Sequence, residues 1–202
     1  FVFISGVSSR YSKNNIKRGL IVLAVAAAMT VCTFFFMRSQ IVVFGVLHLL
    51  GLCMVLHGLV YRGGVEKSSA FFGFIICLVL YALTWGVSDG YIGFFGIARF
   101  IELPDFLHRH YFLSPLGFLS PDFYSSDYFP VLPWLFLFFA GSFLGVAFRQ
   151  GSMPGFFYRR HSLFLRRIGR HTLIIYILHQ PVLYGLLTLV FMVLEKSGLY
   201  IR

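Results

Sequence analysis

A histidine and a proline lie within an apolar stretch, residues 172–194, that is long enough to cross a membrane as a helix. His179 is eight residues beyond His171, about 12 Å along a helix that rises ~1.5 Å per residue, and this is too deep for the membrane interface. Pro181 cannot donate a backbone hydrogen bond and frees the carbonyl of Ile177 as an acceptor. Because ionisable groups inside a membrane are costly, His179 is a candidate catalytic residue for proton transfer.

Polar side chains beside His179 extend this candidate site along the same predicted helix. Tyr176, Gln180 and Tyr184 recur at four-residue spacing, which puts them on one face. They could form the wall of a polar cavity in which Tyr176 and Gln180 bind substrate. The alternative is a structural histidine that bonds to a neighbouring helix or to the carbonyl freed by the proline. The sequence leaves both interpretations open.

His48 is a second candidate catalytic residue inside an apolar segment. It lies between Gly45 and Gly51, about 10 Å from the outer end of its predicted span, and the glycines leave room for an interior cavity. A hydrogen-bonded structural role is the alternative. His57 lies near the inner end of the same segment, and we interpret it as an interfacial residue.

Asp127 and Tyr128 precede the predicted span that begins near Val131. With Ser126 before them and Pro133 in the first turn, a helix cap explains the carboxylate. The alternative is that Asp127 and Tyr128 bind a polyhydroxylated acceptor at the outer mouth of the bundle. Both residues are therefore candidate substrate-binding residues.

Two arginines are candidates for binding an anionic donor. Arg10 follows a Ser-Gly turn close to the membrane, and Arg170 comes just before the last apolar stretch. Guanidinium groups bind phosphates in a bidentate manner, so both could hold a nucleotide-bearing donor such as coenzyme A. Membrane topology alone also explains basic residues at these positions.

The sequence disfavours two other classes of site. His108 and His110 are two residues apart near Asp105, but without a strand this spacing is not specific for a metal, and we expect none. The net charge of +10 lies mainly in short loops beside the membrane, where topology and anionic lipids account for it. We therefore expect no nucleic-acid partner.

The elements that position these residues are apolar helices, since the chain is 58% hydrophobic and only 12% charged. This composition predicts an all-α, polytopic transmembrane bundle that forms a single domain over residues 1–202. The chain opens within an apolar segment, so we expect one or more N-terminal spans to be missing. We predict the end of a sixth span at residues 1–7 and five full spans at 19–36, 41–61, 70–87, 131–148 and 172–194.

The basic residues predict the orientation of this bundle. Most of the 17 Lys and Arg residues fall in loops 8–18, 61–69 and 149–170, which should therefore face the cytoplasm. The long connection 88–130 lies on the opposite side, and we predict that it forms a packed lid with a short helix at 91–101. Gly141 and Gly145 have the small-xxx-small spacing that lets two helices approach closely.

Motifs in order along the chain resemble those of integral-membrane acyltransferases. Residues 1–10, Phe-Val-Phe-Ile-Ser-Gly-Val-Ser-Ser-Arg, resemble the Ser-Gly stretch that ends an early helix in these enzymes. Residues 45–51 and 127–134 resemble bacterial members of the heparan-α-glucosaminide N-acetyltransferase-like family. Residues 169–181, which end in Leu-His-Gln-Pro, resemble the last helix of that family and of its sugar-acyltransferase relatives.

This resemblance implies an enzyme that transfers an acyl group, typically acetyl from acetyl-CoA, across the membrane to a sugar amine or hydroxyl. Its partners would be acyl-CoA, a carbohydrate or lipid-linked sugar acceptor and the bilayer of the bacterial cytoplasmic membrane, and it could form a homo-oligomer. The resemblance also implies that the main catalytic histidine of the family lies upstream of the Ser-Gly stretch. His48 stands where the eukaryotic members have glutamine.

Two other classes of function remain open on the sequence alone. A transporter or flippase for a lipid-linked or small polar substrate would use the same cavity without chemistry, because broken helices and polar groups at mid-membrane are typical of transporters. A structural subunit of a membrane complex would use the polar groups only for helix packing.

Overall fold

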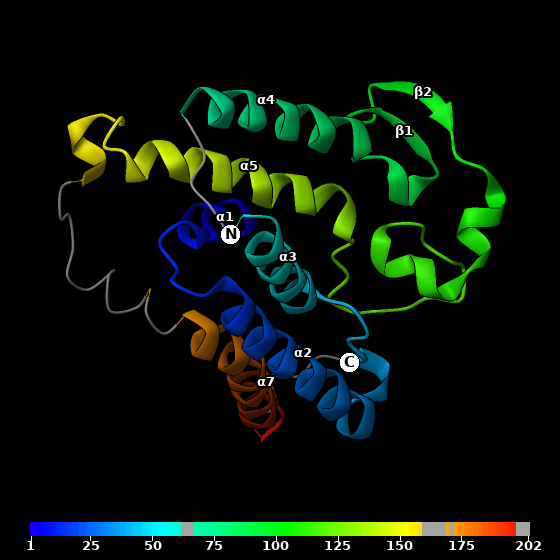
Figure 1. Cartoon of the computed structure of the whole chain (residues 1–202). Coiled ribbons are helices and arrows are strands. Elements are labelled where there is room, and N and C mark those ends of the chain that lie inside the picture. Colours follow the sequence, from blue (N-terminus) through cyan, green and yellow to red (C-terminus); the bar gives the residue numbers. More distant parts are fainter. Residues whose placement is uncertain (62–66, 159–168, 170–171, 197–202) are drawn as a thin grey trace. The chain divides into compact units, whose positions relative to one another are not determined.

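The computed structural model describes residues 1–61, 67–158, 169 and 172–196 (Figure 1). The chain divides into two compact units, Phe1–Met153 and Pro154–Arg202, which we describe separately. The first unit contains most of the helices and the long connection. The described part of the second consists of a short 3-10 turn, Gly155–Tyr158, and one long helix, α7, at Thr172–Lys196.

The first unit is a helical bundle with a small β-hairpin at one end (Figure 1). In the bundle, α1 packs on α5, α4 packs on α5, and α2 packs on α3. The helices are α1 at Val2–Ser9, α2 at Asn15–Phe36, α3 at Val46–Val60, α4 at Lys67–Thr84 and α5 at Val131–Arg149.

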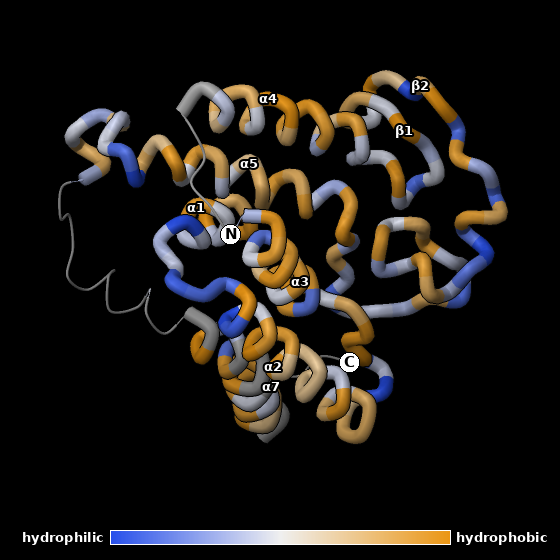
Figure 2. Tube along the Cα trace, in the orientation of Figure 1, coloured by the Kyte–Doolittle hydropathy of each residue, from blue (hydrophilic) through white to orange (hydrophobic). Residues whose placement is uncertain are grey.

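Three stretches of the described residues are helical, long and apolar enough to cross a membrane: Asn15–Phe36, Ser69–Asp89 and Val131–Arg149. Figure 2 shows these helices as mostly hydrophobic, whereas the link between α1 and α2 is hydrophilic. The chain is thus a mostly helical integral membrane protein. The span expected at 41–61 stays a prediction, since α3 has 15 residues, about 22 Å of helix against about 30 Å of hydrocarbon. The span expected at 172–194 also stays a prediction.

Glycines set the distance between α1 and α5. A Cβ atom on Gly6 would overlap the carbonyl of Phe138, and one on Gly141 would overlap the carbonyl of Phe3. Gly145 lies against α1 in the same way, with the Val7 carbonyl 2.8 Å from the place of a Cβ. The prediction that the Gly141–Gly145 spacing allows a close helix contact is confirmed.

The long outer connection contains strands instead of the helix predicted at 91–101. Strands β1 (Tyr91–Phe94) and β2 (Ala98–Glu102) pair antiparallel, with Tyr91 opposite Glu102. The prediction was wrong because the glycines between the aromatic residues serve a hairpin: Gly96 has φ +77°, and a Cβ on Gly93 would overlap the opposite strand at the Ala98 carbonyl. Two 3-10 turns, Asp105–Arg109 and Tyr111–Leu116, follow. Whether the connection acts as a lid stays a prediction.

We expect Gly141→Ala to lower the melting temperature of the detergent-solubilised protein, because the added methyl group must push α1 away from α5. Overpacking of this kind costs about 1–3 kcal/mol, which exceeds the gain in helix propensity of about 0.5–1 kcal/mol. Gly155→Ala is the control, since a Cβ there meets nothing within 4 Å. Equal melting temperatures for the two variants would contradict this account of the contact.

Candidate active site

A buried polar cluster lies where α1, α2, α3 and α5 meet, at the end of the first unit that the charge pattern assigns to the cytoplasm. We call it the inner cluster and define it as Arg10, Asn15, His57 and Ser142. His57 is its centre and is only 3% exposed. The imidazole Nδ1 lies 3.0 Å from Asn15 Nδ2, and Nε2 lies 2.7 Å from Ser142 Oγ.

The surroundings of Asn15 determine which imidazole nitrogen of His57 carries the proton. Asn15 Nδ2 donates a hydrogen bond to the carbonyl of Ser9 at 2.9 Å, so the amide nitrogen, and not its oxygen, must face this side. Its second hydrogen then points to Nδ1 of His57, which accepts. The imidazole proton therefore sits on Nε2 and is donated to Ser142.

The order Ser142–His57–Asn15 has the connectivity of a nucleophile, its base and an orienting group. A base, however, must offer a lone pair to the serine hydroxyl, and here Nε2 carries a hydrogen. Ser142 is also fully buried. In this conformation the three residues form a hydrogen-bonded core, and the serine is not activated.

Arg10 turns into the bundle instead of extending toward solvent. Its Nε donates to the carbonyl of Ser142 at 3.1 Å, and its guanidinium lies 4.4 Å from the ring centroid of Tyr61. Burial lowers the pKa of Arg10 from its ordinary value, Tyr61 acts in the opposite direction, and Arg149 adds to the lowering. Nη2 of Arg10 is buried without a hydrogen-bond partner in the described part of the chain. One strong donor is thus left for a ligand or water.

His48 lies in a second group of polar contacts at the opposite end of α3. Its Nδ1 accepts from the backbone N–H of Gly45 at 3.3 Å, and Nε2 lies 3.4 Å from Thr30 Oγ1. The Thr30 hydroxyl donates to the Val42 carbonyl at 2.7 Å, so it accepts from the histidine. Both nitrogens of His48 are engaged, one of them in capping the first turn of its own helix.

Asp127 caps a helix, but not the one that the sequence indicated. Its Oδ2 accepts from the backbone N–H of Val46 at 3.2 Å, at the start of α3. The expected cap was at the helix near Val131, where Pro130 is the capping residue and makes no side-chain cap bond. Gly45 permits the contact, since a Cβ there would lie 2.6 Å from the carboxylate. Asp127 and His48 are therefore neighbours at one helix end.

Tyr128 lies beside the outer connection. Its hydroxyl donates to the carbonyl of Ser114 at 2.6 Å. Burial raises the pKa of Tyr128, and a hydrogen bond with the side chain of Ser88 partly offsets this rise. Tyr128 thus stays protonated at neutral pH and links the two ends of the outer connection.

Residues 1–181 match the model of the family described as heparan-alpha-glucosaminide N-acetyltransferase, catalytic. The chain belongs to this family. The match covers the whole first unit and continues into α7, and it confirms the family resemblance of the sequence motifs. No curated protein and no solved structure matches the chain. Membership indicates a membrane acetyltransferase-type function.

The structure brings together only some of the residues predicted for this acetyltransferase-type site. His48 and Asp127 are neighbours, whereas Arg10 belongs to the inner cluster at the other end of α3. Arg170 lies outside the described residues, as does the side chain of Gln180. All of these assignments stay predictions.

Tyr176 and His179 lie on α7 in the second unit. The exposed His179 ring packs against the ring of Tyr176, with centroids 5.3 Å apart. Its Nδ1 also contacts the carbonyl of Tyr176, one turn earlier on the helix.

Sequence reasoning missed three members of the inner cluster. The position of His57 near the end of its apolar segment favours an interfacial interpretation, and the position of Asn15 in a basic loop gives no signal of a buried partner. Ser142 was hidden in the Gly141–Gly145 packing motif. The signal that could have found it is the hydroxyl itself, since a serine between two contact glycines lies close to the neighbouring helix and can bond across the crossing.

We expect His57→Ala to destabilise the protein more than a surface histidine substitution does. Removal of the ring leaves the Asn15 amide and the Ser142 hydroxyl buried with fewer partners, at a cost of about 1–3 kcal/mol per unpaired group. Thermal unfolding in detergent measures the effect. His110→Ala is the control, because His110 is exposed. A melting temperature as high as that of the control would show that the cluster does not stabilise the bundle.

Substitutions of Asp127 separate a cap from a substrate contact. Asn also accepts backbone hydrogen bonds at helix N-termini, so Asp127→Asn should keep the stability of α3, whereas Asp127→Ala should lose about 0.5–2 kcal/mol. If the residue only caps, acyl transfer follows stability in both variants. Loss of activity in Asp127→Asn at unchanged melting temperature would show that the negative charge contacts the acceptor.

Proposed function

We propose that this protein transfers an acetyl group from cytoplasmic acetyl-CoA to a sugar amine or hydroxyl on the outer side of a bacterial cytoplasmic membrane. The observation that carries the proposal is the family match over residues 1–181. Three helices long and apolar enough to cross a membrane support it, because a donor and an acceptor on opposite sides require a membrane-embedded catalyst.

The two polar groups at the ends of α3 support this division between donor and acceptor sides. His48 and His57 are nine residues apart, about 13 Å along a helix. At the inner end, the unpartnered donor of Arg10 suits an oxygen of the anionic acyl-CoA. At the outer end, Asp127 lies beside His48 and suits a hydroxyl or amine donor of the acceptor. Tyr128, Tyr176 and Gln180 are further acceptor residues under the proposal.

The reaction needs a base that takes a proton from the acceptor as it attacks the thioester carbon. The thiol of coenzyme A leaves, and the acetyl group forms an amide or ester bond. His179 is the first choice, because an ionisable group inside an apolar span is costly and therefore favours a functional role. His48 must first give up its bond to the Gly45 N–H before it can act. A histidine that carries the acetyl group covalently is the alternative route.

We expect Arg10→Ala to weaken acetyl-CoA binding by about tenfold or more, the effect of losing a hydrogen bond from a charged group. Arg10→Lys should restore part of it. His179→Ala should keep binding and reduce turnover by about 10²–10⁴-fold. Both are measured on the full-length protein in detergent by calorimetry and thiol release. Absence of saturable acetyl-CoA binding in a folded sample would refute the proposed function.

A further inference from the structure

The β-hairpin of the outer connection folds back along the end of α4. The chain reverses at Gly90, which has φ +85°, and β1 then lies against α4. The backbone N–H of Tyr91 donates to the carbonyl of Gly86 at 3.1 Å. At the turn of the hairpin, the N–H of Phe95 donates to the carbonyl of Ala82 at 3.3 Å. The turn is therefore level with Ala82, which lies in the last turn of α4.

This level lies inside the apolar stretch that is long enough to cross a membrane, Ser69–Asp89. The 21 residues of the stretch correspond to about 30 Å of helix, which is the thickness of the hydrocarbon core. Ala82 is seven residues before Asp89, about 10 Å of helix from the outer end of the stretch. The hairpin turn thus lies beside a part of α4 that belongs below the surface of the bilayer.

The turn is apolar, whereas hairpin turns that face water are usually polar. Phe95 and Gly96 have positive φ, +46° and +77°, and the N–H of Ile97 donates to the carbonyl of Phe94 at 2.8 Å. This geometry is typical of a type I′ turn, in which Asn, Asp or Gly is preferred at the first central position. Here that position holds Phe95, although a positive φ strains a bulky residue. An apolar side chain is thus retained at a point where the backbone favours a small polar one.

Aromatic side chains join this turn to the ends of two helices. The centroid of the Phe95 ring lies 5.9 Å from that of Tyr81 and 5.8 Å from that of Trp85, both at the end of α4. Trp85 also contacts Trp134 in the first turn of α5, with centroids 6.1 Å apart. Trp and Tyr are enriched at membrane–water interfaces. The hairpin turn is therefore continuous with the aromatic residues that mark the outer ends of α4 and α5.

The turn and β2 expose large apolar side chains to the surroundings. Four of them are 45% to 84% exposed: Phe94, Ile97, Phe100 and Ile101. The sequence has no charged residue between Asp89 and Arg99. A contiguous apolar surface of this kind marks an interaction site for protein or lipid.

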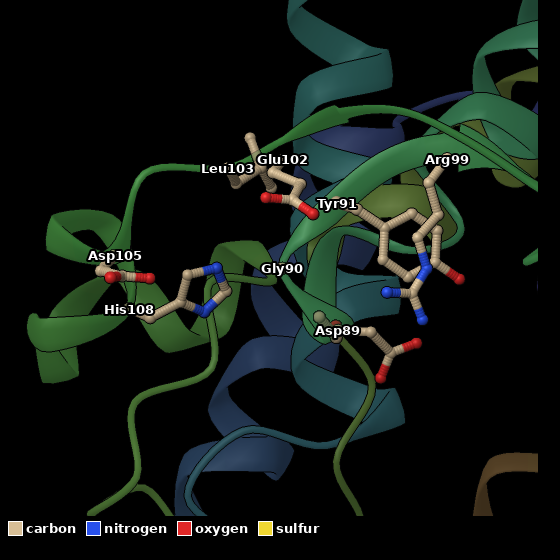
Figure 3. Close-up of a pocket in the computed structure, with 9 residues that line it drawn as sticks. Asp89, Gly90, Tyr91, Arg99, Glu102, Leu103, Asp105 and His108 are labelled. Carbon is tan, nitrogen blue, oxygen red and sulfur yellow. The ribbon is translucent and has the colours of Figure 1, made fainter.

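Polar side chains gather at the opposite end of the hairpin, its base. Figure 3 shows them around a hollow of about 400 Å³ that is lined by Asp89, Glu102, Asp105 and His108. Arg99 is opposite Gly93, close to the turn, but its guanidinium lies over the ring of Tyr91 at the base, 4.7 Å from the centroid. Long cationic side chains extend in this way from apolar surroundings toward water. The hairpin is thus amphipathic from end to end.

We infer that the β-hairpin inserts turn-first into the leaflet beside the outer connection, and that lipid acyl chains contact its exposed apolar side chains. The depth is limited, because the sheet has only two strands among the described residues and the outer edge of β2 leaves backbone groups without a strand partner. Hydrocarbon does not tolerate such groups. The turn therefore stops about 5–10 Å into the leaflet, where water and lipid ester groups can bond to the edge. Insertion requires only the membrane and is independent of the proposed acetyl transfer.

Spin-label accessibility in vesicles tests this insertion. Ile97→Cys is combined with Cys32→Ala in the full-length protein, labelled with a nitroxide and reconstituted into phosphatidylcholine vesicles. Cys32→Ala removes the exposed thiol of the chain, since the other two cysteines are buried. Phe72→Cys, at an exposed position of α4, is the lipid reference, and Asp122→Cys, at an exposed position of the same outer connection, is the water reference.

The Ile97→Cys label should collide with oxygen severalfold more often than the Asp122→Cys label, and with a water-soluble nickel chelate severalfold less often. The Phe72→Cys label should behave as the Ile97→Cys label does. Phe94→Cys, on the other side of the turn, should give the same result and replaces Ile97→Cys if that variant does not fold.

Collision with the nickel chelate as frequent as at the Asp122→Cys label would overturn the inference. Protection from both reagents would also overturn it, because protein and not lipid would then cover the turn. Spin–spin broadening in that case would identify the cover as a second copy of the chain, and its absence would identify another segment of the same chain.

Discussion

The close contact between α1 and α5 is the constraint on which the inner cluster depends. Gly6 and Gly141 bring the two backbones so near that either Cβ would overlap a carbonyl of the other helix. This contact sets Arg10, directly after α1, against Ser142 of α5. Ser142 in turn holds His57 of α3. A bulkier residue at the crossing would therefore separate three helices, because the hydrogen bonds that join them share one serine.

The inner cluster is stabilising only as far as its polar groups are paired, since an unpaired polar group in an apolar bundle costs free energy. Asn15 illustrates the balance. Its amide nitrogen serves both Ser9 and His57, while its oxygen is buried without a partner among the described residues. Nη2 of Arg10 is likewise buried without a hydrogen-bond partner among the described residues. The cluster thus combines a rigid part, which orients His57, with one open donor and one open acceptor that water or a ligand must satisfy.

Much of the fold follows from the sequence, because helices in a membrane are encoded locally by apolar length and small-residue spacing. The helices around 19–36, 70–87 and 131–148 and the Gly141 contact are of this kind. The missed features depend on partners distant in sequence. His57 and Ser142 are 85 residues apart, and Asp127 caps a helix 81 residues before it. The helix predicted at 91–101 was wrong for a different reason. Aromatic and glycine residues in this segment are compatible with both an interfacial helix and a tight strand pair, and the pairing of β1 with β2 decides between them.

The asymmetric distribution of charge predicts how the bundle is oriented in the membrane. Under the proposed function, it also attracts the anionic donor to one side. Basic loops at the predicted inner side attract an anionic donor, and Arg10 extends that positive charge into the bundle. The outer connection 88–130 contains five of the seven Asp and Glu residues and only two arginines, so its net charge is negative and repels free coenzyme A. A catalyst with an anionic donor gains from this arrangement, because the donor is concentrated only on the side of the membrane from which it binds.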